Sequence, residues 1–280
     1  MRQIASICIL SLLISCKSVL VYTDVDSPVF YDNDLSGFDY LPDELIKVVT
    51  YNIHYGIPPE EALKEIKSHS LLDDTDIFLL QEMDEVGVKY LAENLGLNFV
   101  YYPITKNDKL DLNFGNAVLL KSKILEHKKV ILPHEKKGNG RKRHAVFCRT
   151  EMNDQTLWIC NAHTETTVMR RNKRLNQRLY IMNYINVNIP DNEFVIVGGD
   201  LNTFFKRDLM NTISKFKEGG YTHASKEVNG TARAIFNIFN PTLDHIFIKG
   251  LEVISSGKED RSLLSDHKPV FVELKVKSIE

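Results

Sequence analysis

The central stretch of the chain reads Val195-Ile196-Val197-Gly198-Gly199-Asp200-Leu201-Asn202-Thr203. Its short apolar, β-branched run predicts a buried strand, and the two glycines predict a sharp turn where that strand ends. In open α/β sheets, ligands bind beyond the ends of the strands, so Asp200 and Asn202 are expected at the mouth of a site. Taken alone, the stretch also fits an ordinary tight turn, because Gly, Asp and Asn are common turn residues.

Five other predicted strands carry polar residues of the same kind at one end. These residues are Asn52, Glu82, Asn161 with His163, Asp244 with His245, and Asp266 with His267. Each has an ordinary explanation when considered singly, as a turn residue, an exposed strand end or a histidine on a half-buried strand. Six such coincidences favour one shared pocket, so the sequence predicts a single site built from several strand ends.

The side chains of this set suit the hydrolysis of phosphoesters. Asn52 and Glu82 offer hard oxygen ligands for Mg²⁺ or Mn²⁺, and no Cys/His spacing typical of structural zinc is present. His163 and His267 can donate to phosphoryl oxygens or protonate a leaving oxygen, and Asp200 can accept a proton from water. Together they indicate attack of water on phosphorus, assisted by a metal ion.

Strand and helix patterns alternate from residue 46 onward. Besides the central stretch, strands are predicted over residues 46–52, 76–81, 99–102, 116–121, 145–152, 156–162, 243–248 and 269–276, and helices over 58–68, 86–95, 167–187 and 207–216. Several consecutive strands between residues 99 and 165 exclude a pure βαβ array. The pattern predicts one domain over residues 46–280, of the α/β (α+β) class, with two packed sheets and outer helices.

Seven motifs occur in the order found in one known superfamily. They are Thr50-Tyr51-Asn52-Ile53-His54-Tyr55-Gly56, Leu80-Gln81-Glu82-Met83-Asp84, Phe114-Gly115-Asn116-Ala117-Val118-Leu119, Asn161-Ala162-His163, Gly199-Asp200-Leu201-Asn202-Thr203, Leu243-Asp244-His245-Ile246-Phe247 and Ser265-Asp266-His267-Lys268-Pro269-Val270. In this order they resemble the endonuclease/exonuclease/phosphatase superfamily of deoxyribonucleases, AP exonucleases, bacterial sphingomyelinases and inositol-polyphosphate 5-phosphatases. The resemblance covers residues 46 to 276 and implies a four-layered α/β sandwich of two mostly antiparallel sheets flanked by helices.

The resemblance also implies roles for individual residues. It implies that Asn52 and Glu82 bind the metal and that Asp200 activates the water. Asn202 and His163 would contact the phosphate. Asp244 would pair with His267, and Asp266 would support that pair or the metal. His163 is in addition the candidate general acid, and either Asp200 or His267 could take the proton from water. His163 stands where AP exonucleases carry Tyr, which places the chain nearer the deoxyribonuclease and phospholipase branches. His245 stands where many relatives carry Tyr, a change expected to affect the surroundings of the site rather than the reaction.

Residues 1–15 have the pattern of a lipoprotein signal peptide. Arg2 precedes an apolar run from Ile4 to Ile14, which is too short to span a bilayer. Leu13-Ile14-Ser15-Cys16 resembles a bacterial lipobox, which implies export and a lipid anchor on Cys16 at the periplasmic or cell-surface side of a membrane. The alternative is a plain secretory signal in which Cys16 is incidental. Residues 16–45 are polar and predict a tether.

Positive charge gathers in two segments of a chain whose net charge is -2. Residues 121–143 contain nine Lys and Arg, and residues 170–178 contain five with no acidic residue. Such clusters suit a polyanionic substrate or an anionic membrane, although a solvated charged face is the ordinary alternative.

Cys148 and Cys160 lie on two strand-like runs that an Asn153-Asp154-Gln155 turn would join. Export would permit a disulfide between them, but two buried free thiols are the commoner outcome.

Three functions fit these residues, and a monomer is the expected form. The first is a Mg²⁺- or Mn²⁺-dependent phosphodiesterase or phosphatase acting on a lipid head group or another small phosphoester. The second is an extracytoplasmic nuclease acting on DNA or RNA, whose affinity should fall steeply with salt. The third is a non-catalytic binding lipoprotein, which the full set of catalytic residue types disfavours.

Overall fold

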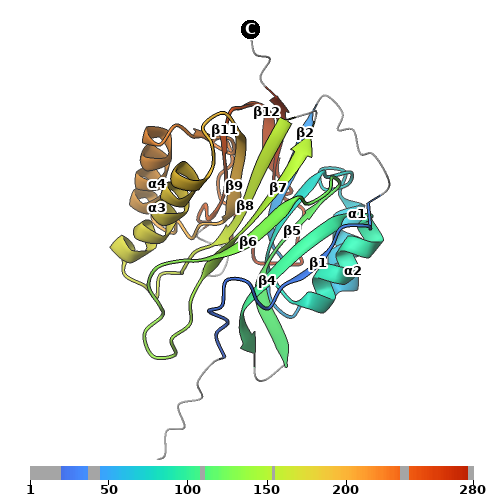
Figure 1. Ribbon diagram of the computed structural model, residues 1–280, viewed down its shortest axis with the longest axis horizontal. Helices are drawn as coiled ribbons and strands as arrows, with labels where there is room; N and C mark the ends of the chain where they lie inside the picture. The colour runs from blue at the N-terminus through green and yellow to red at the C-terminus, as the bar shows by residue number, and fades with distance from the viewer. Residues whose placement is uncertain (1–19, 37–44, 108–110, 153–154, 234–239, 277–280) are drawn as a thin grey trace, which may run out of the picture.

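Two β-sheets pack face to face, and helices cover both outer faces (Figure 1). The computed structural model describes residues 20–36, 45–107, 111–152, 155–233 and 240–276. The strand order is β1-β4-β5-β3-β2-β13-β12 in the seven-stranded sheet and β10-β11-β9-β8-β7-β6 in the six-stranded sheet. The fold is therefore the predicted four-layered α/β sandwich.

The bounds of the elements are as follows. The strands are β1 (Phe30–Asp32), β2 (Ile46–Asn52), β3 (Ile77–Met83), β4 (Asn98–Asn107), β5 (Leu112–Leu120), β6 (Glu126–Ile131), β7 (His144–Met152), β8 (Gln155–His163), β9 (Phe194–Asp200), β10 (Thr222–His223), β11 (Asp244–Lys249), β12 (Leu251–Lys258) and β13 (Val270–Val276). The helices are α1 (Pro59–Ser68), α2 (Glu85–Leu95), α3 (Arg171–Asn188) and α4 (Lys206–Glu218).

Three apolar cores hold the layers together. The core between the two sheets contains Leu79 and Ile196, while their chain neighbours Leu80 and Val197 point to the helix-covered faces. Strands alternate in this way because successive side chains leave opposite faces of a sheet. Helices α1 and α2 bury their apolar faces on the seven-stranded sheet, and α3 and α4 bury theirs on the six-stranded sheet. Both faces of each central strand are thus buried, which explains their nearly continuous apolar sequences.

Each sheet contains one parallel strand pair, and these pairs decide where the site lies. β2 pairs with β3 and β8 pairs with β9, and each pair is joined through a helix, α1 or α3. The carboxyl ends of parallel strands lie at the same edge of a sheet. A hydrogen bond of 3.2 Å from Nδ2 of Asn52 to Oδ2 of Asp200 joins the end of β2 to the end of β9. The two parallel pairs therefore open onto the same edge of the sandwich.

The glycines of the central stretch lie within β9 rather than in a turn after it, so the predicted turn is wrong. Gly199 has φ +130°, and a Cβ there would lie 1.9 Å from the carbonyl oxygen of Ala162 on β8. A Cβ at Gly198 would lie 2.5 Å from Leu79 in the other sheet. The two glycines thus allow β9 to approach its neighbours closely and carry the strand on to Asp200.

The sequence patterns missed four strands, and all are short or lie at sheet margins. They are β1, β6, β10 and β12. β12 has mostly half-exposed residues, including Ser255, Ser256 and Gly257, so its alternation of apolar and polar residues is weak. Helix α3 begins at Arg171 instead of residue 167, because the preceding residues form a loop along the site edge.

The predicted tether over residues 16–45 is wrong for the part that the structure describes. β1 pairs with β4 through partners such as Phe30 and Tyr101, and the side chain of Asn33 exchanges hydrogen bonds with the backbone of Ile124. Residues 20–36 therefore belong to the folded domain.

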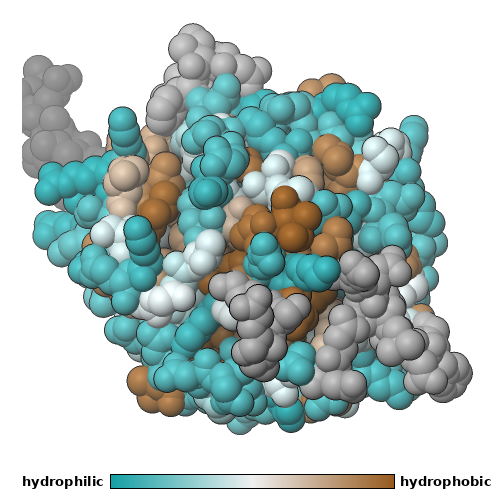
Figure 2. Space-filling model, turned by 90° about the horizontal axis from the view of Figure 1, so that it is seen from above, coloured by the Kyte–Doolittle hydropathy of each residue, from teal (hydrophilic) through white to brown (hydrophobic). Residues whose placement is uncertain are grey.

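The predicted signal peptide and Cys16 lie outside the described residues. Within the described ranges, no helix is long and apolar enough to cross a membrane. The face seen in Figure 2 is mainly hydrophilic, with apolar side chains gathered near its middle.

Cys148 and Cys160 are free and fully buried. In the β7–β8 pairing, Cys160 lies opposite Phe147 rather than opposite Cys148. The two thiols consequently point to different faces of the sheet, one into the core between the sheets and the other toward the helices. The predicted strands of this hairpin are confirmed, whereas residues 153–154 of its turn lie outside the described residues.

Candidate active site

A cavity of about 300 Å³ opens at the edge where both parallel strand pairs end. Seven of the eight predicted site residues line it, namely Asn52, Glu82, His163, Asp200, Asn202, Asp266 and His267. The eighth, Asp244, lies behind His267 and is almost completely buried. The structure therefore brings the predicted set together from strands that are far apart in the sequence.

Strand register puts three of these side chains at one level of the six-stranded sheet. On one side of Asp200 its partner is His163 in parallel β8, and on the other side its partner is Asp244 in antiparallel β11. His163 and Asp200 end their strands at the edge where Asp244 begins its strand. The three polar groups therefore share one end of an otherwise apolar sheet. The position of Asp200 at the centre follows from the central place of β9 between β8 and β11.

A β-bulge aims Glu82 into the cavity. Gln81 and Met83 pair with the adjacent residues Asn116 and Gly115 of β5, so Glu82 is an extra residue without a partner. Its φ of +62° is uncommon for a side chain with a Cβ and re-orients the end of the strand. Without the bulge, the alternation of side chains along β3 would point Glu82 toward the helices. With the bulge, Met83 packs on that helix-covered face instead. Strain of this kind at a cavity wall is typical of a functional position.

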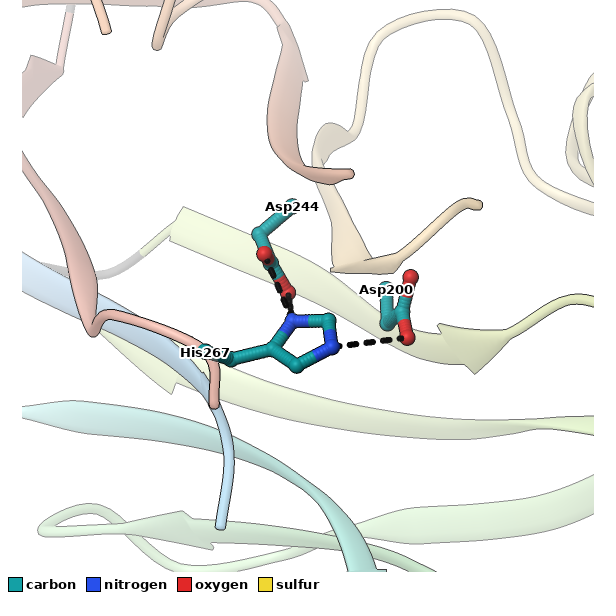
Figure 3. Close-up of side chains that lie close together, drawn as sticks. All are labelled: Asp200, Asp244 and His267. Atoms are coloured by element: carbon teal, nitrogen blue, oxygen red, sulfur yellow. Dashed lines mark hydrogen bonds and ion pairs between the residues drawn. The ribbon is translucent and has the colours of Figure 1, made fainter. Parts of the chain in front are cut away.

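His267 connects two carboxylates, as Figure 3 shows. Its Nδ1 lies 2.9 Å from Oδ2 of Asp244, and its Nε2 lies 3.8 Å from Oδ2 of Asp200. The Asp244 carboxylate also accepts a hydrogen bond of 2.6 Å from Oγ1 of Thr231. The imidazole is thus held in one orientation, with Nε2 facing the cavity residue Asp200.

The surroundings shift the pKa of both groups upward. Burial lowers the pKa of His267, but the carboxylates of Asp244 and Asp200 outweigh this effect and raise it above the usual range. Burial raises the pKa of Asp200, and His267 opposes that shift. These shifts favour the charged form of His267 and make Asp200 a stronger base than an ordinary carboxylate.

His163 receives a hydrogen bond from an arginine that the sequence patterns did not single out. Nη1 of Arg143 lies 3.1 Å from Nδ1 of His163, and Nη2 binds Glu165 at 3.2 Å. Arginine can only donate, so Nδ1 of His163 accepts and the ring proton resides on Nε2, 3.4 Å from Asp200. Burial and then Arg143 lower the pKa of His163 well below its usual range. This environment favours a neutral hydrogen-bond donor over the general acid that the resemblance implied.

Asn202 also lies in position to contact a ligand. Its φ of +49° is a left-handed conformation that Asn tolerates well. The backbone N–H of Asn202 donates to Oδ1 of Asp200 at 3.0 Å, and Nδ2 donates to the carbonyl of Thr164 at 2.9 Å. A carboxamide has two N–H groups, so one remains for a phosphoryl oxygen in the cavity.

The three residues predicted to bind metal are organised by one short segment. The N–H of His54 donates to Oδ1 of Asn52 at 3.1 Å, and the N–H of Tyr55 donates to Oε2 of Glu82 at 3.2 Å. Nδ1 of His54 lies 3.2 Å from Oδ1 of Asp266 at the exposed rim. One amide and two carboxylate groups on the same cavity wall form a donor set that fits Mg²⁺ or Mn²⁺.

Asp200, Asp244 and His267 form a second group whose ligand atoms lie within 4.8 Å of one another. In the present arrangement, Nδ1 of His267 and Oγ1 of Thr231 already bind the Asp244 carboxylate. These bonds suit proton handling, whereas Asn52 and Glu82 line the cavity and accept only one backbone N–H each, which leaves lone pairs on their oxygens for an ion. The oxygen-rich wall is therefore the better candidate for the ion.

Two functional contacts had no readable sequence signal. Arg143 acts on His163, and Thr231 acts on Asp244, and neither belongs to a spaced pattern with its partner. His245 lies outside the cavity and is fully buried, with its ring between Oγ1 of Thr203 at 2.6 Å and the ring of His223 at 3.2 Å. This placement agrees with the expected effect on the surroundings rather than on the reaction.

Comparison with known proteins identifies the family. Residues 49–267 match the profile of the Endonuclease/Exonuclease/phosphatase family. The chain belongs to this family. Members of the Endonuclease/Exonuclease/phosphatase family hydrolyse phosphoester bonds and generally use a divalent metal, which agrees with the oxygen-rich cavity. Among curated protein sequences, none matches the chain significantly.

Solved structures share the fold at low sequence identity. Humanized D. rerio TDP2 superimposes with a TM-score of 0.69 at 15% identity, over 84% of this chain and 100% of that chain. The family protein of Bacteroides vulgatus gives 0.68 at 19% identity, over 84% and 100%. The catalytic domain of human Nocturnin gives 0.68 at 17% identity, over 89% and 98%. At these identities the likeness concerns the fold.

Proposed function

We propose that the protein is a metal-dependent phosphoesterase that acts on a lipid head group or another small phosphoester outside the cytoplasm. The observation that carries this proposal is the Asp244–His267–Asp200 arrangement, which ends in a cavity that also contains Asn52 and Glu82. A volume of about 300 Å³ is at the lower end for small-molecule sites, which range from roughly 300 to 1,000 Å³. It suits one phosphoryl group with a small substituent.

Asp200 is the proposed base. Protonated His267 has no free lone pair, so the buried carboxylate of Asp200 is the group that accepts the proton of the attacking water. As the water oxygen bonds to phosphorus, the ester P–O bond breaks and the leaving oxygen takes a proton from solvent or from His267. Nε2–H of His163 and the free N–H of Asn202 donate to the non-bridging oxygens. Mg²⁺ or Mn²⁺ held by Asn52, Glu82 and Asp266 would neutralise phosphoryl charge.

An exported form anchored through Cys16 fits a substrate at a membrane surface. A Cys16→Ser variant should move from the membrane fraction to the soluble fraction. Unchanged partition would refute the lipid anchor while leaving the catalytic proposal intact. The expectation of a monomer is equally open to test by light scattering.

A nuclease is the second candidate, since D. rerio TDP2 has been solved with a single-strand DNA product. A purified-protein panel distinguishes the two candidates, using Mg²⁺ with plasmid DNA, RNA, sphingomyelin, phosphatidylinositol and sugar phosphates. We expect hydrolysis of a head group or small phosphoester, abolished by EDTA and by Asp200→Ala or His267→Ala. The exposed Asp73→Ala is the matched control. Full activity in folded Asp200→Ala protein would overturn the mechanism, and inactivity of the wild type on every substrate would favour a binding lipoprotein.

A further inference from the structure

A second hollow, of about 220 Å³, lies beside the catalytic cavity. Its walls come from the loop before β7, the loop before α3 and the first turn of α3, which belong to the two positive segments of the sequence. Four cationic residues line it, Lys136, Lys137, Arg170 and Lys173, and Glu135 is its one acidic residue. We call this the basic hollow. The fold thus joins two positive clusters that are more than thirty residues apart in the chain.

Within the described ranges, the four cations make no direct ion pair with an acidic group, although the charge of Lys136 helps to lower the pKa of the nearby Glu165 carboxyl. Their like charges repel one another. Two other members of the same cluster are used differently, because Arg174 binds Asp208 and Arg178 donates to the carbonyl of Leu201, both in the interior. Arg174 and Arg178 therefore stabilise the fold, and the cations of the basic hollow remain available for an anionic ligand.

The walls of the basic hollow are fixed in place before any ligand binds. Nε2 of Gln177 on α3 donates to the carbonyl of Pro133 at 3.0 Å, and His134 contacts Asn176 at 2.9 Å. On the opposite wall, buried Arg174 donates to the carbonyl of Met169 at 2.6 Å. Both loops are thus tied to the same helix, so binding an anion requires little ordering of the backbone.

The basic hollow and the catalytic cavity are consecutive along one loop. Thr166 and Thr167 line the catalytic cavity, and Val168, Met169 and Arg170 line the basic hollow. A backbone hydrogen bond of 3.1 Å from Met169 to Thr166 folds the loop into a turn between them. A substrate whose reacting phosphoryl group lies at Asp200 can therefore extend past the two threonines into the cationic site.

We propose that the basic hollow binds a second phosphate group of the substrate, so that the enzyme prefers phosphoesters that carry another phosphate besides the one attacked. This inference builds on the proposed function and narrows its substrate class. Two or more lysine contacts to a phosphate are charge-assisted and act mainly on binding.

Pyrophosphate binding tests the basic hollow without any catalysis. Calorimetry would compare the wild type, Lys136→Gln/Lys173→Gln, and the matched control Lys64→Gln/Lys67→Gln, whose lysines are exposed on α1. We expect affinity to fall about tenfold or more in the first variant, as for loss of hydrogen bonds between charged groups, and to stay unchanged in the control. Equal affinity in all three proteins would overturn the inference.

Paired substrates then identify the source of the second phosphate. One pair is the p-nitrophenyl ester of thymidine 5′-phosphate with and without a 3′-phosphate, and the other is glycerophosphoinositol with and without a 4-phosphate. The ratio of kcat/KM within a pair should fall about tenfold in Lys136→Gln/Lys173→Gln. The pair that shows this fall distinguishes a nucleotide from a lipid head group, and unchanged ratios in both pairs would overturn the inference. If the wild type binds pyrophosphate as expected but hydrolyses no substrate, the proposed function is refuted and the inference about phosphate binding in the basic hollow is not.

Discussion

Nη1 of Arg143 donates to Nδ1 of His163 at 3.1 Å, and this contact determines which ring nitrogen carries the proton into the cavity. An acidic partner at the same place would favour the charged imidazolium. The buried guanidinium instead keeps the ring neutral and leaves Nε2–H as a donor.

Replacing Arg143 should release His163 from this tautomer. In Arg143→Gln the carboxamide can donate or accept, so we expect a mixture of ring tautomers, a higher pKa of His163 and a kcat lower by about 10²-fold, typical of losing one transition-state donor. Nitrogen-15 NMR of the histidine rings measures the tautomer and the pKa directly. Arg143→Lys, which keeps a donor, should retain more activity. A wild-type ring spectrum in Arg143→Gln would disprove this role.

Asp244 should be essential because it orients and charges His267. In Asp244→Asn the loss of the carboxylate lowers the pKa of His267, so the alkaline limb of the pH–rate profile moves to lower pH. We expect kcat to fall by roughly 10³- to 10⁴-fold, the order seen when an orienting Asp is changed to Asn in a catalytic triad. Thr231→Val removes one donor to the Asp244 carboxylate and an acceptor for the backbone N–H groups of Leu243 and Asp244, but it keeps the carboxylate and should cost much less activity. Similar rates for Asp244→Asn and Thr231→Val would contradict the assignment.

Metal binding should stabilise the fold through Glu82. An ion that binds only the folded protein adds about 2.7 kcal/mol at a concentration one hundred times its Kd. Mg²⁺ or Mn²⁺ should therefore raise the Tm of the wild type and have little effect on Glu82→Gln. Exposed Glu218→Gln on α4 is the matched control and should respond like the wild type. An equal rise in Tm for Glu82→Gln would assign the ion to other ligands.

Gly199 should tolerate no side chain. Its φ of +130° and the approach of the Ala162 carbonyl mean that Gly199→Ala must separate β9 from β8. We expect a loss of more than about 3 kcal/mol in the free energy of unfolding, measured by urea denaturation. Gly138→Ala also has a positive φ but meets nothing within 4 Å, so it should cost only about 1 kcal/mol. Comparable losses would show that backbone conformation, and not strand contact, explains the glycine.

Stability should decrease toward acidic pH because several histidines are buried in the neutral form. Burial lowers the pKa of His144 to about 3 and that of His223 to about 4. Between these values and the unfolded pKa near 6.5, the unfolded chain binds more protons, so each residue reduces stability by up to about 1.4 kcal/mol per pH unit as the pH falls. His144→Gln should flatten the dependence of Tm on pH from 6.5 to 4. An unchanged slope would exclude His144 as a contributor.

Local sequence was sufficient for much of the fold. Continuous apolar runs such as residues 46–52 and 195–197 predicted the central strands, because strands buried on both faces have no polar alternation. Helix α2 was found through its apolar periodicity and the Gly96 stop, which adopts the left-handed conformation expected at a helix end. Strands such as β1 and β12 escaped because margin strands are short and half exposed.

The sequence by itself also determined which residue types form the site, since Asn52, Glu82, His163, Asp200 and His267 all stand at ends of apolar runs. Only the tertiary structure decided how they act. The bulge at Glu82, the pairing of Arg143 with His163 and the meeting of Lys136 with Lys173 depend on strand register and loop packing between distant segments. These relationships carry no local signal, because the energy of a side-chain contact depends on distance in space and not on separation along the chain.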